Sequence, residues 1–182
     1  MILIDTNVLV YAVQEETIQH DASRRLVEAA ADGRVMACLL PQILLEFLAV
    51  ISDKRRTDNP ALSDEASELA ESFAASFAVL HPSASVFNIL ISLIKEFGVR
   101  GQHVYDCHLV AQMIDCGIDT ICTYNLKDFD KYPILARTPD KILSDMDGTN
   151  LPIVQDKPLP TLHGRIIGSL SRAEIYEDRK RS

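Results

Sequence analysis

Four acidic residues stand where an ordinary surface charge is not the simplest explanation. Asp5 closes the apolar run MILID, Glu46 interrupts the apolar run ILLEFLAVI, and Asp106 and Asp128 lie in the polar contexts VYDCH and TYNLKDF. Carboxylates gathered at one place suit hard, oxygen-seeking cations such as Mg²⁺ or Mn²⁺. Such ions activate a bound water and hold a phosphate group during in-line displacement. A converging set of these acids would therefore support hydrolysis of a phosphate ester.

Glu46 is informative because its predicted helix surrounds it with mostly apolar neighbours. Gln42, Ile43, Ala49 and Val50 lie three or four positions away, on the same side of a helix. A carboxylate on so apolar a face is expensive to bury unless a cation or a metal ion compensates its charge. The alternative is a side chain that reaches the helix edge and pairs with a lysine or an arginine. The sequence alone leaves both interpretations open.

The elements that must position these acids alternate along the chain, which predicts an α/β domain. The predicted strands are short and apolar throughout, so we expect a mostly parallel central sheet of four to five strands with helices on both faces. Residues 126–143 are expected to form a loop with a short edge strand near Ile134–Ala136. The other strands are expected at 1–5, 34–40, 77–82 and 118–125, and the helices at 18–33, 41–56, 57–76, 83–101 and 104–117.

In an open parallel sheet, ligands bind beyond the carboxyl ends of the strands, where the strand order reverses. Asp5 lies at the carboxyl end of the first predicted strand, and Thr123, Asn125 and Asp128 lie at the carboxyl end of the fourth, so they share this edge if the two strands are neighbours. The helix that carries Asp106 leads into the fourth strand. As a simple helix–strand unit, it is expected to place its amino end near the opposite edge. Strand and helix order alone therefore does not bring Asp106 to Asp5.

Composition limits the classes of protein this chain can belong to. The net charge of −8 and the pI near 5.0 are unfavourable for a general nucleic-acid binder, although bound divalent ions would invert the field around clustered acids. No apolar run is long enough to span a bilayer, and no basic segment precedes an apolar stretch at the start. The four cysteines form no CxxC pair. We therefore expect a cytoplasmic protein with reduced thiols and no membrane contact.

The sequence changes character after about residue 143. Residues 1–143 are expected to form the folded domain, and 144–182 a C-terminal extension that combines a linker with a packing arm. One short strand or helix is expected at 165–176. Asp145 to Thr149 spells DMDGT, a nucleophile motif of haloacid-dehalogenase-type phosphatases. Too little chain follows it to build that fold, so we interpret it as a polar turn.

The ordered segments LIDTNVLVYA, LPQILLEFLAVIS, VYDCHLVAQM and CTYNLKDF resemble the motifs of PIN-domain ribonucleases, and most of all the VapC-type toxins of toxin–antitoxin pairs. The resemblance covers roughly residues 1–143 and implies a PIN-like three-layer fold. It also implies that the acids share a metal site, with Asp5, Glu46, Asp106 and Asp128 as catalytic residues and metal ligands. Supporting residues would orient these carboxylates by hydrogen bonds: Thr6, Asn7, Thr123 and Asn125.

The same resemblance implies an activity and partners. Family members of this kind cleave single-stranded or loop RNA with Mg²⁺ or Mn²⁺, usually form homodimers, and are silenced by a cognate antitoxin. The alternative is a non-catalytic PIN-like binding or scaffold module, which the loss of one acid would have favoured. A nuclease acting on DNA flaps fits less well, because such enzymes carry more acids and an arch of basic residues. His103 and His108, beside Asp106, are expected to be exposed or locally hydrogen-bonded.

Two features depart from the family pattern. Residues 38–42, CLLPQ, lack the hydroxyl residue that relatives often carry before the second acid. The tail is also longer than a minimal PIN domain needs, and it contains Arg165, Arg172 and Arg179. Some antitoxins insert an arginine-bearing arm into the acidic pocket, and this tail could imitate that in cis or across a dimer. The simpler interpretation is a packing arm.

Overall fold

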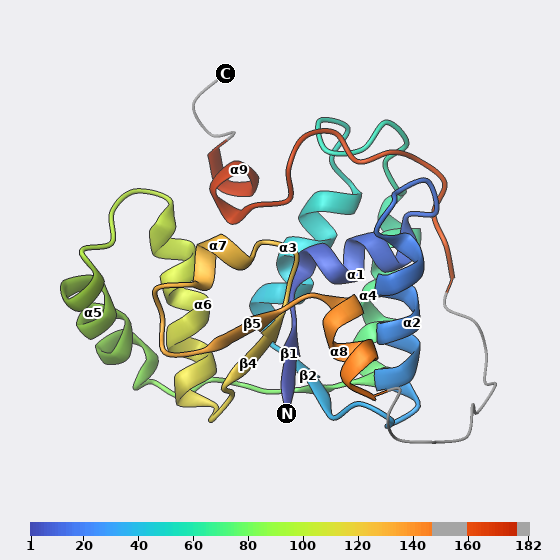
Figure 1. Cartoon of the computed structure of the whole chain (residues 1–182). Coiled ribbons are helices and arrows are strands. Elements are labelled where there is room, and N and C mark those ends of the chain that lie inside the picture. Colours follow the sequence, from blue (N-terminus) through green and yellow to red (C-terminus); the bar gives the residue numbers. More distant parts are fainter. Residues whose placement is uncertain (147–159, 178–182) are drawn as a thin grey trace.

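Five short parallel strands form the centre of the molecule (Figure 1). The computed structural model describes residues 1–146 and 160–177. The sheet order is β3-β2-β1-β4-β5, which confirms the prediction of a mostly parallel sheet of four to five strands. The strands are β1 (Ile2–Ile4), β2 (Ala37–Leu39), β3 (Ala78–Val79), β4 (Thr120–Cys122) and β5 (Leu135–Arg137).

Helices cover both faces of this sheet, which gives three layers. Helices α5 and α6 pack together on one face, and α2 and α8 pack together on the other (Figure 1). Helix α1 contacts α2 and α3, and α3 contacts α4. The helices are α1 (Thr6–Val13), α2 (His20–Ala31), α3 (Pro41–Ile51), α4 (Ser63–Ser76), α5 (Val86–Phe97), α6 (His103–Asp115), α7 (Leu126–Phe129), α8 (Pro139–Met146) and α9 (Arg172–Glu177).

The strand order reverses between β1 and β4. The chain passes from β1 outward to β2 and β3, and then returns to place β4 on the other side of β1. Leu3 pairs with Ile121 and Ile4 with Cys122, so the two strands end at the same level. The backbone N–H of Asp5 then donates to the carbonyl of Cys122 at 3.0 Å. Polar residues that follow β1 and β4 therefore meet at one edge, where parallel sheets bind ligands.

Three helices form outside the predicted helical segments. Helix α1 lies in residues 6–17, for which no element was predicted, and seven of its eight residues are buried. A helix buried on nearly all sides has no polar face, so its sequence lacks the 3.6-residue period that reveals a surface helix. Helix α7 and the start of α8 lie in the predicted loop at residues 126–143, and α8 begins with Pro139, a favoured residue in a first turn. Asp145 lies in α8 rather than in a turn, while residues 147–149 of the DMDGT motif lie outside the described residues.

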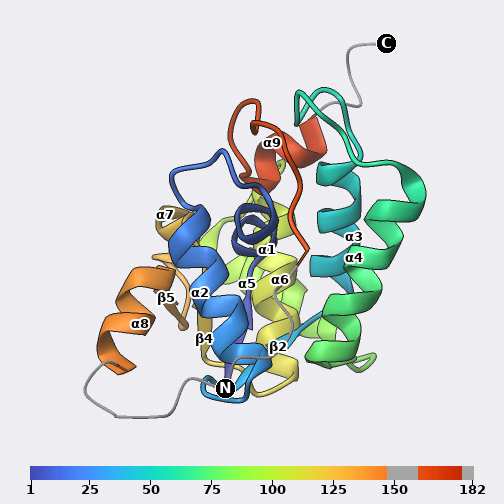
Figure 2. The ribbon, with the colours of Figure 1, turned by 90° about the vertical axis from the view of Figure 1, so that its right-hand side faces the viewer.

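Residues 160–177, which we call the C-terminal arm, return along the domain to the carboxyl edge of the sheet (Figure 2). Isolated bridges join Leu162 to Gln14 and Ile166 to Thr57. The arm ends in α9, which lies against α6. A short strand or helix was predicted at 165–176, and a helix forms there that extends to Glu177. Within the two described ranges, no helix has the length and apolarity to cross a membrane.

Candidate active site

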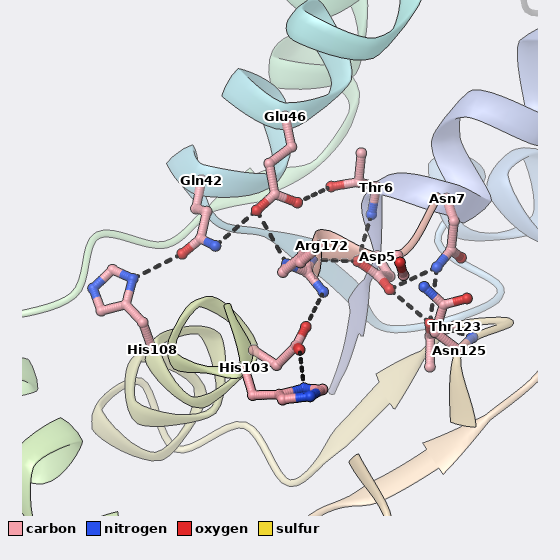
Figure 3. Close-up of polar contacts among 12 residues, drawn as sticks. Asp5, Thr6, Asn7, Gln42, Glu46, His103, His108, Thr123, Asn125 and Arg172 are labelled. Atoms are coloured by element: carbon pink, nitrogen blue, oxygen red, sulfur yellow. Dashed lines mark hydrogen bonds and ion pairs between the residues drawn. The ribbon is translucent and has the colours of Figure 1, made fainter. Parts of the chain in front are cut away.

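Three buried carboxylates converge at the edge where the strand order reverses (Figure 3). Asp5 follows β1, Glu46 lies in the middle of α3, and Asp106 lies in the first turn of α6. All three surround the guanidinium group of Arg172. Its Nη2 lies 2.5 Å from Asp5 Oδ1, its Nε 3.0 Å from Glu46 Oε1, and its Nη1 3.7 Å from Asp106 Oδ1. These side chains are at most 3% exposed.

The position of Asp106 corrects the expectation drawn from strand and helix order. Helix α6 ends just before β4 and runs antiparallel to it, so the last turn of α6 lies at the amino edge of the sheet. Its first turn, which carries Asp106, must then lie at the carboxyl edge, together with Asp5. The expectation that Asp106 lies at the opposite edge was wrong. It placed the amino end of α6, instead of its carboxyl end, beside the start of β4.

The fold holds one oxygen of Asp5 firmly and presents the other to Arg172. Asp5 Oδ2 accepts hydrogen bonds from Asn7 Nδ2 at 2.9 Å and from Thr123 Oγ1 at 2.6 Å. Asp5 Oδ1 accepts from the backbone N–H of Thr6 at 2.8 Å, so Asp5 also caps α1. Asn7 and Thr123, two of the four expected supporting residues, therefore both donate to the same oxygen of Asp5.

Glu46 is held in the same way, by one expected and one unexpected residue. Thr6 Oγ1 donates to Glu46 Oε2 at 2.8 Å, and Gln42 Nε2 donates to Glu46 Oε1 at 2.8 Å. Gln42 is oriented in turn, because its Oε1 lies 3.0 Å from His108 Nδ1 and 2.5 Å from Gln112 Nε2. Burial lowers the pKa of His108, which favours the neutral ring. Residues 38–42 contain no hydroxyl side chain, and the amide of Gln42 makes the polar contact to Glu46 instead. Its position four residues before Glu46, on the same side of the helix, was the sequence signal for this contact.

Asp106 is the least compensated of the three. Its buried Oδ1 makes no hydrogen bond, and its Oδ2 lies 3.8 Å from Nδ1 of the exposed His103. The pKa of Asp106 is raised to about 6, mainly by burial, with the charges of Asp128 and Asp5 adding to the rise and those of Arg172 and His103 opposing it. Asp106 Oδ1 is therefore a buried carboxylate oxygen without a hydrogen-bond donor, which is rare in folded proteins.

Asp128 belongs to the rim of the pocket. It lies on α7, half-buried, and burial raises its pKa while the charges of His103 and Arg172 lower it. Asn125, which precedes α7, differs from the expectation. Its side-chain Nδ2 donates to the carbonyl of Leu170 in the arm at 3.1 Å rather than to a carboxylate.

Of the three tail arginines, only Arg172 is shown in the acidic pocket. Arg165 is exposed and pairs with Glu16, and Arg179 lies outside the described residues. Burial disfavours the charged form of Arg172, but the carboxylates of Asp5 and Glu46 outweigh that effect and raise its pKa above the ordinary value. The contact is made in cis, within one chain.

The side chains are spaced around a guanidinium group and not around an ion. Among residues 1–146 and 160–177, no group of three or more His, Cys, Asp or Glu side chains is placed to hold a metal. The chemistry of the set nonetheless fits a hard cation, because Asp5 Oδ1, Glu46 Oε1 and Asp106 Oδ1 all face the position of Arg172.

Comparison with known proteins agrees with this architecture. The PIN domain profile matches residues 2–135. The ribonuclease VapC24 of Mycobacterium tuberculosis is 29% identical over 148 residues, which are 80% of this chain and 99% of that protein. Two solved structures share the fold. VapBC2 from Rickettsia felis, bound to a promoter DNA fragment, matches with a TM-score of 0.56 and 19% identity over 76% of this chain and 98% of that one. A toxin–antitoxin complex from Klebsiella pneumoniae matches with a TM-score of 0.50 and 17% identity, again over 76% of this chain and 98% of that one.

Proposed function

Because this chain belongs to the PIN domain family, we propose that it is a metal-dependent ribonuclease that hydrolyses RNA phosphodiester bonds, and that it is the toxin of a toxin–antitoxin pair. The observation that carries the proposal is the convergence of Asp5, Glu46 and Asp106 at the edge where the strand order reverses. A relative that is covered almost completely carries the name ribonuclease. All four acids are present, so we prefer catalysis to a non-catalytic binding or scaffold role.

The proposed ligands of Mg²⁺ or Mn²⁺ are Asp5, Glu46 and Asp106, with Asp128 completing the pocket from its rim. A bound divalent ion would supply a water of lowered pKa and offset the charge that develops on the phosphate oxygens. The protein contributes rigidity. Thr123 and Asn7 hold Asp5, while Thr6 and Gln42 hold Glu46, so each acid keeps one oxygen directed at the pocket.

The activity is tested with labelled structured RNA, with single-stranded DNA and with a phosphatase substrate, each with Mn²⁺ and with EDTA. We expect Mn²⁺-dependent cleavage of RNA alone, and a loss of about 10³-fold in Asp5→Asn. Asp119→Asn is the matched control, because Asp119 is an exposed aspartate before β4. Equal cleavage by wild type and Asp5→Asn would refute the assignment, and cleavage of DNA alone would refute the substrate class.

The partners follow from the same proposal. The structural neighbours include a toxin–antitoxin complex, which supports a cognate antitoxin as the partner that silences the enzyme. We also propose a homodimer in the cytoplasm, where RNA is available. Helix α5 leaves Phe87 66% exposed beside the half-buried Leu90 and Ile91, an apolar surface that a second copy would cover. Light scattering of wild type and Phe87→Glu tests this, and a monomeric wild type would contradict it.

A further inference from the structure

The C-terminal arm covers the acidic pocket by many contacts of its own. Leu162 and Leu170 are buried, and the carbonyl of Leu170 accepts from Asn125. Farther back, the backbone N–H of Arg165 donates to Asp58 Oδ1 at 2.7 Å, and Asn59 Nδ2 donates to the carbonyl of His163 at 2.6 Å. The arm is thus bound along its length and is not held by one side chain.

Two residues of α9 enter the pocket from the same face, four positions apart. Arg172 is 2% exposed and contacts all three buried carboxylates, and it lies 5.9 Å from the ring centre of Phe129. Tyr176 donates its hydroxyl to Glu46 Oε1 at 3.1 Å and stacks on Tyr105 at 3.8 Å between ring centres. A cation and an aromatic ring therefore fill the pocket together.

The arm binds the carboxylate oxygens that face the centre of the pocket. Asp5 Oδ1, Glu46 Oε1 and Asp106 Oδ1 all face Arg172. Domain residues also donate to two of them, the backbone N–H of Thr6 to Asp5 Oδ1 and Gln42 Nε2 to Glu46 Oε1, whereas Asp106 Oδ1 makes no hydrogen bond. A divalent cation needs these same oxygens. The guanidinium group and the ion would carry like charge at one position, so the two cannot be bound together.

The arm is also an addition to the domain. The PIN profile ends at residue 135, before the arm begins, and VapC24 is covered almost completely by 80% of this chain. The carboxylates belong to the matched region and Arg172 does not. The arginine is therefore not a requirement of the domain's fold, and a separate role explains its burial.

We propose that the C-terminal arm is an intramolecular inhibitor, which places Arg172 and Tyr176 where the divalent ion and the RNA phosphate must bind. Its displacement opens the site. This inference rests on the proposed function for its biological meaning, but its first test needs no RNA. An arm that is docked in more than about nine molecules of ten raises the apparent dissociation constant for the ion at least about tenfold.

The first test measures Mn²⁺ binding to the full-length protein by calorimetry. Arg172→Met keeps much of the side-chain length and removes the cation, and we expect Mn²⁺ to bind at least about tenfold more tightly than to wild type. Arg165→Met is the matched control, because Arg165 lies in the same arm and touches none of the four acids. Unchanged affinity in Arg172→Met would overturn the proposal.

A second variant loosens the arm without touching the pocket. Gly164 has φ +146°, and an added Cβ would lie 3.0 Å from Asn59 Cβ and Asp58 Oδ1. Gly164→Ala should therefore weaken arm docking and raise Mn²⁺ affinity with Arg172 in place. Gly98 is the matched control, because it also has a positive φ but an added Cβ would meet no atom within 4 Å. Gly98→Ala should therefore lower the stability of the protein and leave its Mn²⁺ affinity unchanged. Equal affinities in both glycine variants would contradict displacement of the arm.

Linkage gives a test in the wild-type protein. If the ion expels the arm, saturating Mn²⁺ must speed amide hydrogen exchange in residues 166–176, because coupling between two ligands is reciprocal. Unaltered exchange at saturation would overturn the proposal. RNA cleavage then separates the two proposals. Tighter Mn²⁺ binding by Arg172→Met without any RNA cleavage would refute the ribonuclease function alone, whereas equal binding and equal cleavage would refute the inhibitory arm alone.

Discussion

Replacing Thr123 by valine should show how strongly the fold depends on positioning Asp5. Thr123 is fully buried, and its hydroxyl joins three partners. It donates to Asp5 Oδ2 at 2.6 Å, and it accepts from Asn7 Nδ2 and from the backbone N–H of Asn125, each at 3.0 Å. Valine has nearly the same shape, so Thr123→Val removes the hydrogen bonds and creates almost no cavity.

The expected loss follows from these contacts. A hydrogen bond to a charged group contributes about 1.5–3 kcal/mol, and a buried N–H left without an acceptor adds about 1 kcal/mol. Asp5 Oδ2 keeps its bond to Asn7 at 2.9 Å, which limits the total. We therefore expect Thr123→Val to lower the free energy of unfolding by about 3 kcal/mol, and the melting temperature by about 6–12 °C.

Urea denaturation followed by circular dichroism, in EDTA at neutral pH, measures this loss. Thr123→Ser is the matched control, because it keeps the hydroxyl and loses only a buried methyl group, for about 1 kcal/mol. Calorimetry should also show Mn²⁺ binding about 10–100-fold more weakly to Thr123→Val, since Asp5 is held less firmly. A valine variant as stable as the serine variant would show that the hydroxyl does not position Asp5, and the reasoning would fail.

Three further predictions address the other acids and the core. Burial raises the pKa of Asp106 from 3.8 to about 6, so between these pH values the folded state retains a proton that the unfolded chain releases. The free energy of unfolding of wild type, relative to Asp106→Asn, should therefore fall by about 3 kcal/mol as the pH rises from 3.8 through 6, and urea titrations in metal-free buffer measure this fall. Phe73→Ala should lower unfolding free energy by about 3–5 kcal/mol, because the buried ring packs edge-on against Phe47 at 5.2 Å, and a loss below 1 kcal/mol in the same assay would contradict that packing. Gln42→Ala should weaken Mn²⁺ binding about tenfold by releasing Glu46, and calorimetry that shows unchanged affinity would exclude this positioning role.

The sheet and its carboxyl edge followed from local patterns in the sequence. Short apolar runs predicted the strands, and Asp5 and Thr123 were expected together because each follows a strand of the same parallel sheet. Helix α1 was missed, since a segment buried on nearly all sides lacks a polar face. Asp106 was placed at the wrong edge by an error of helix direction and not by any lack of signal.

The hydrogen-bonding residues around the acids could be predicted from the sequence only in part. Thr6, Asn7 and Thr123 lie directly after strands or in the turn beside them, so their short side chains can reach only nearby oxygens. Asn125 has the same local context, yet its side chain binds the arm carbonyl of Leu170. Nothing within a few residues of Asn125 distinguishes these two outcomes, because the competing partner comes from a distant segment.

The sequence by itself determined which acids this protein has and that two strand ends would bring some of them to one edge. Those properties depend on short-range periodicity and on the geometry of parallel strands. Only the tertiary structure decided that Arg172, and not Arg165, neutralises the acids, and that it does so within one chain. That pairing joins residues 167 positions apart, and it depends on the whole path of the C-terminal arm and on burial, neither of which a local pattern records.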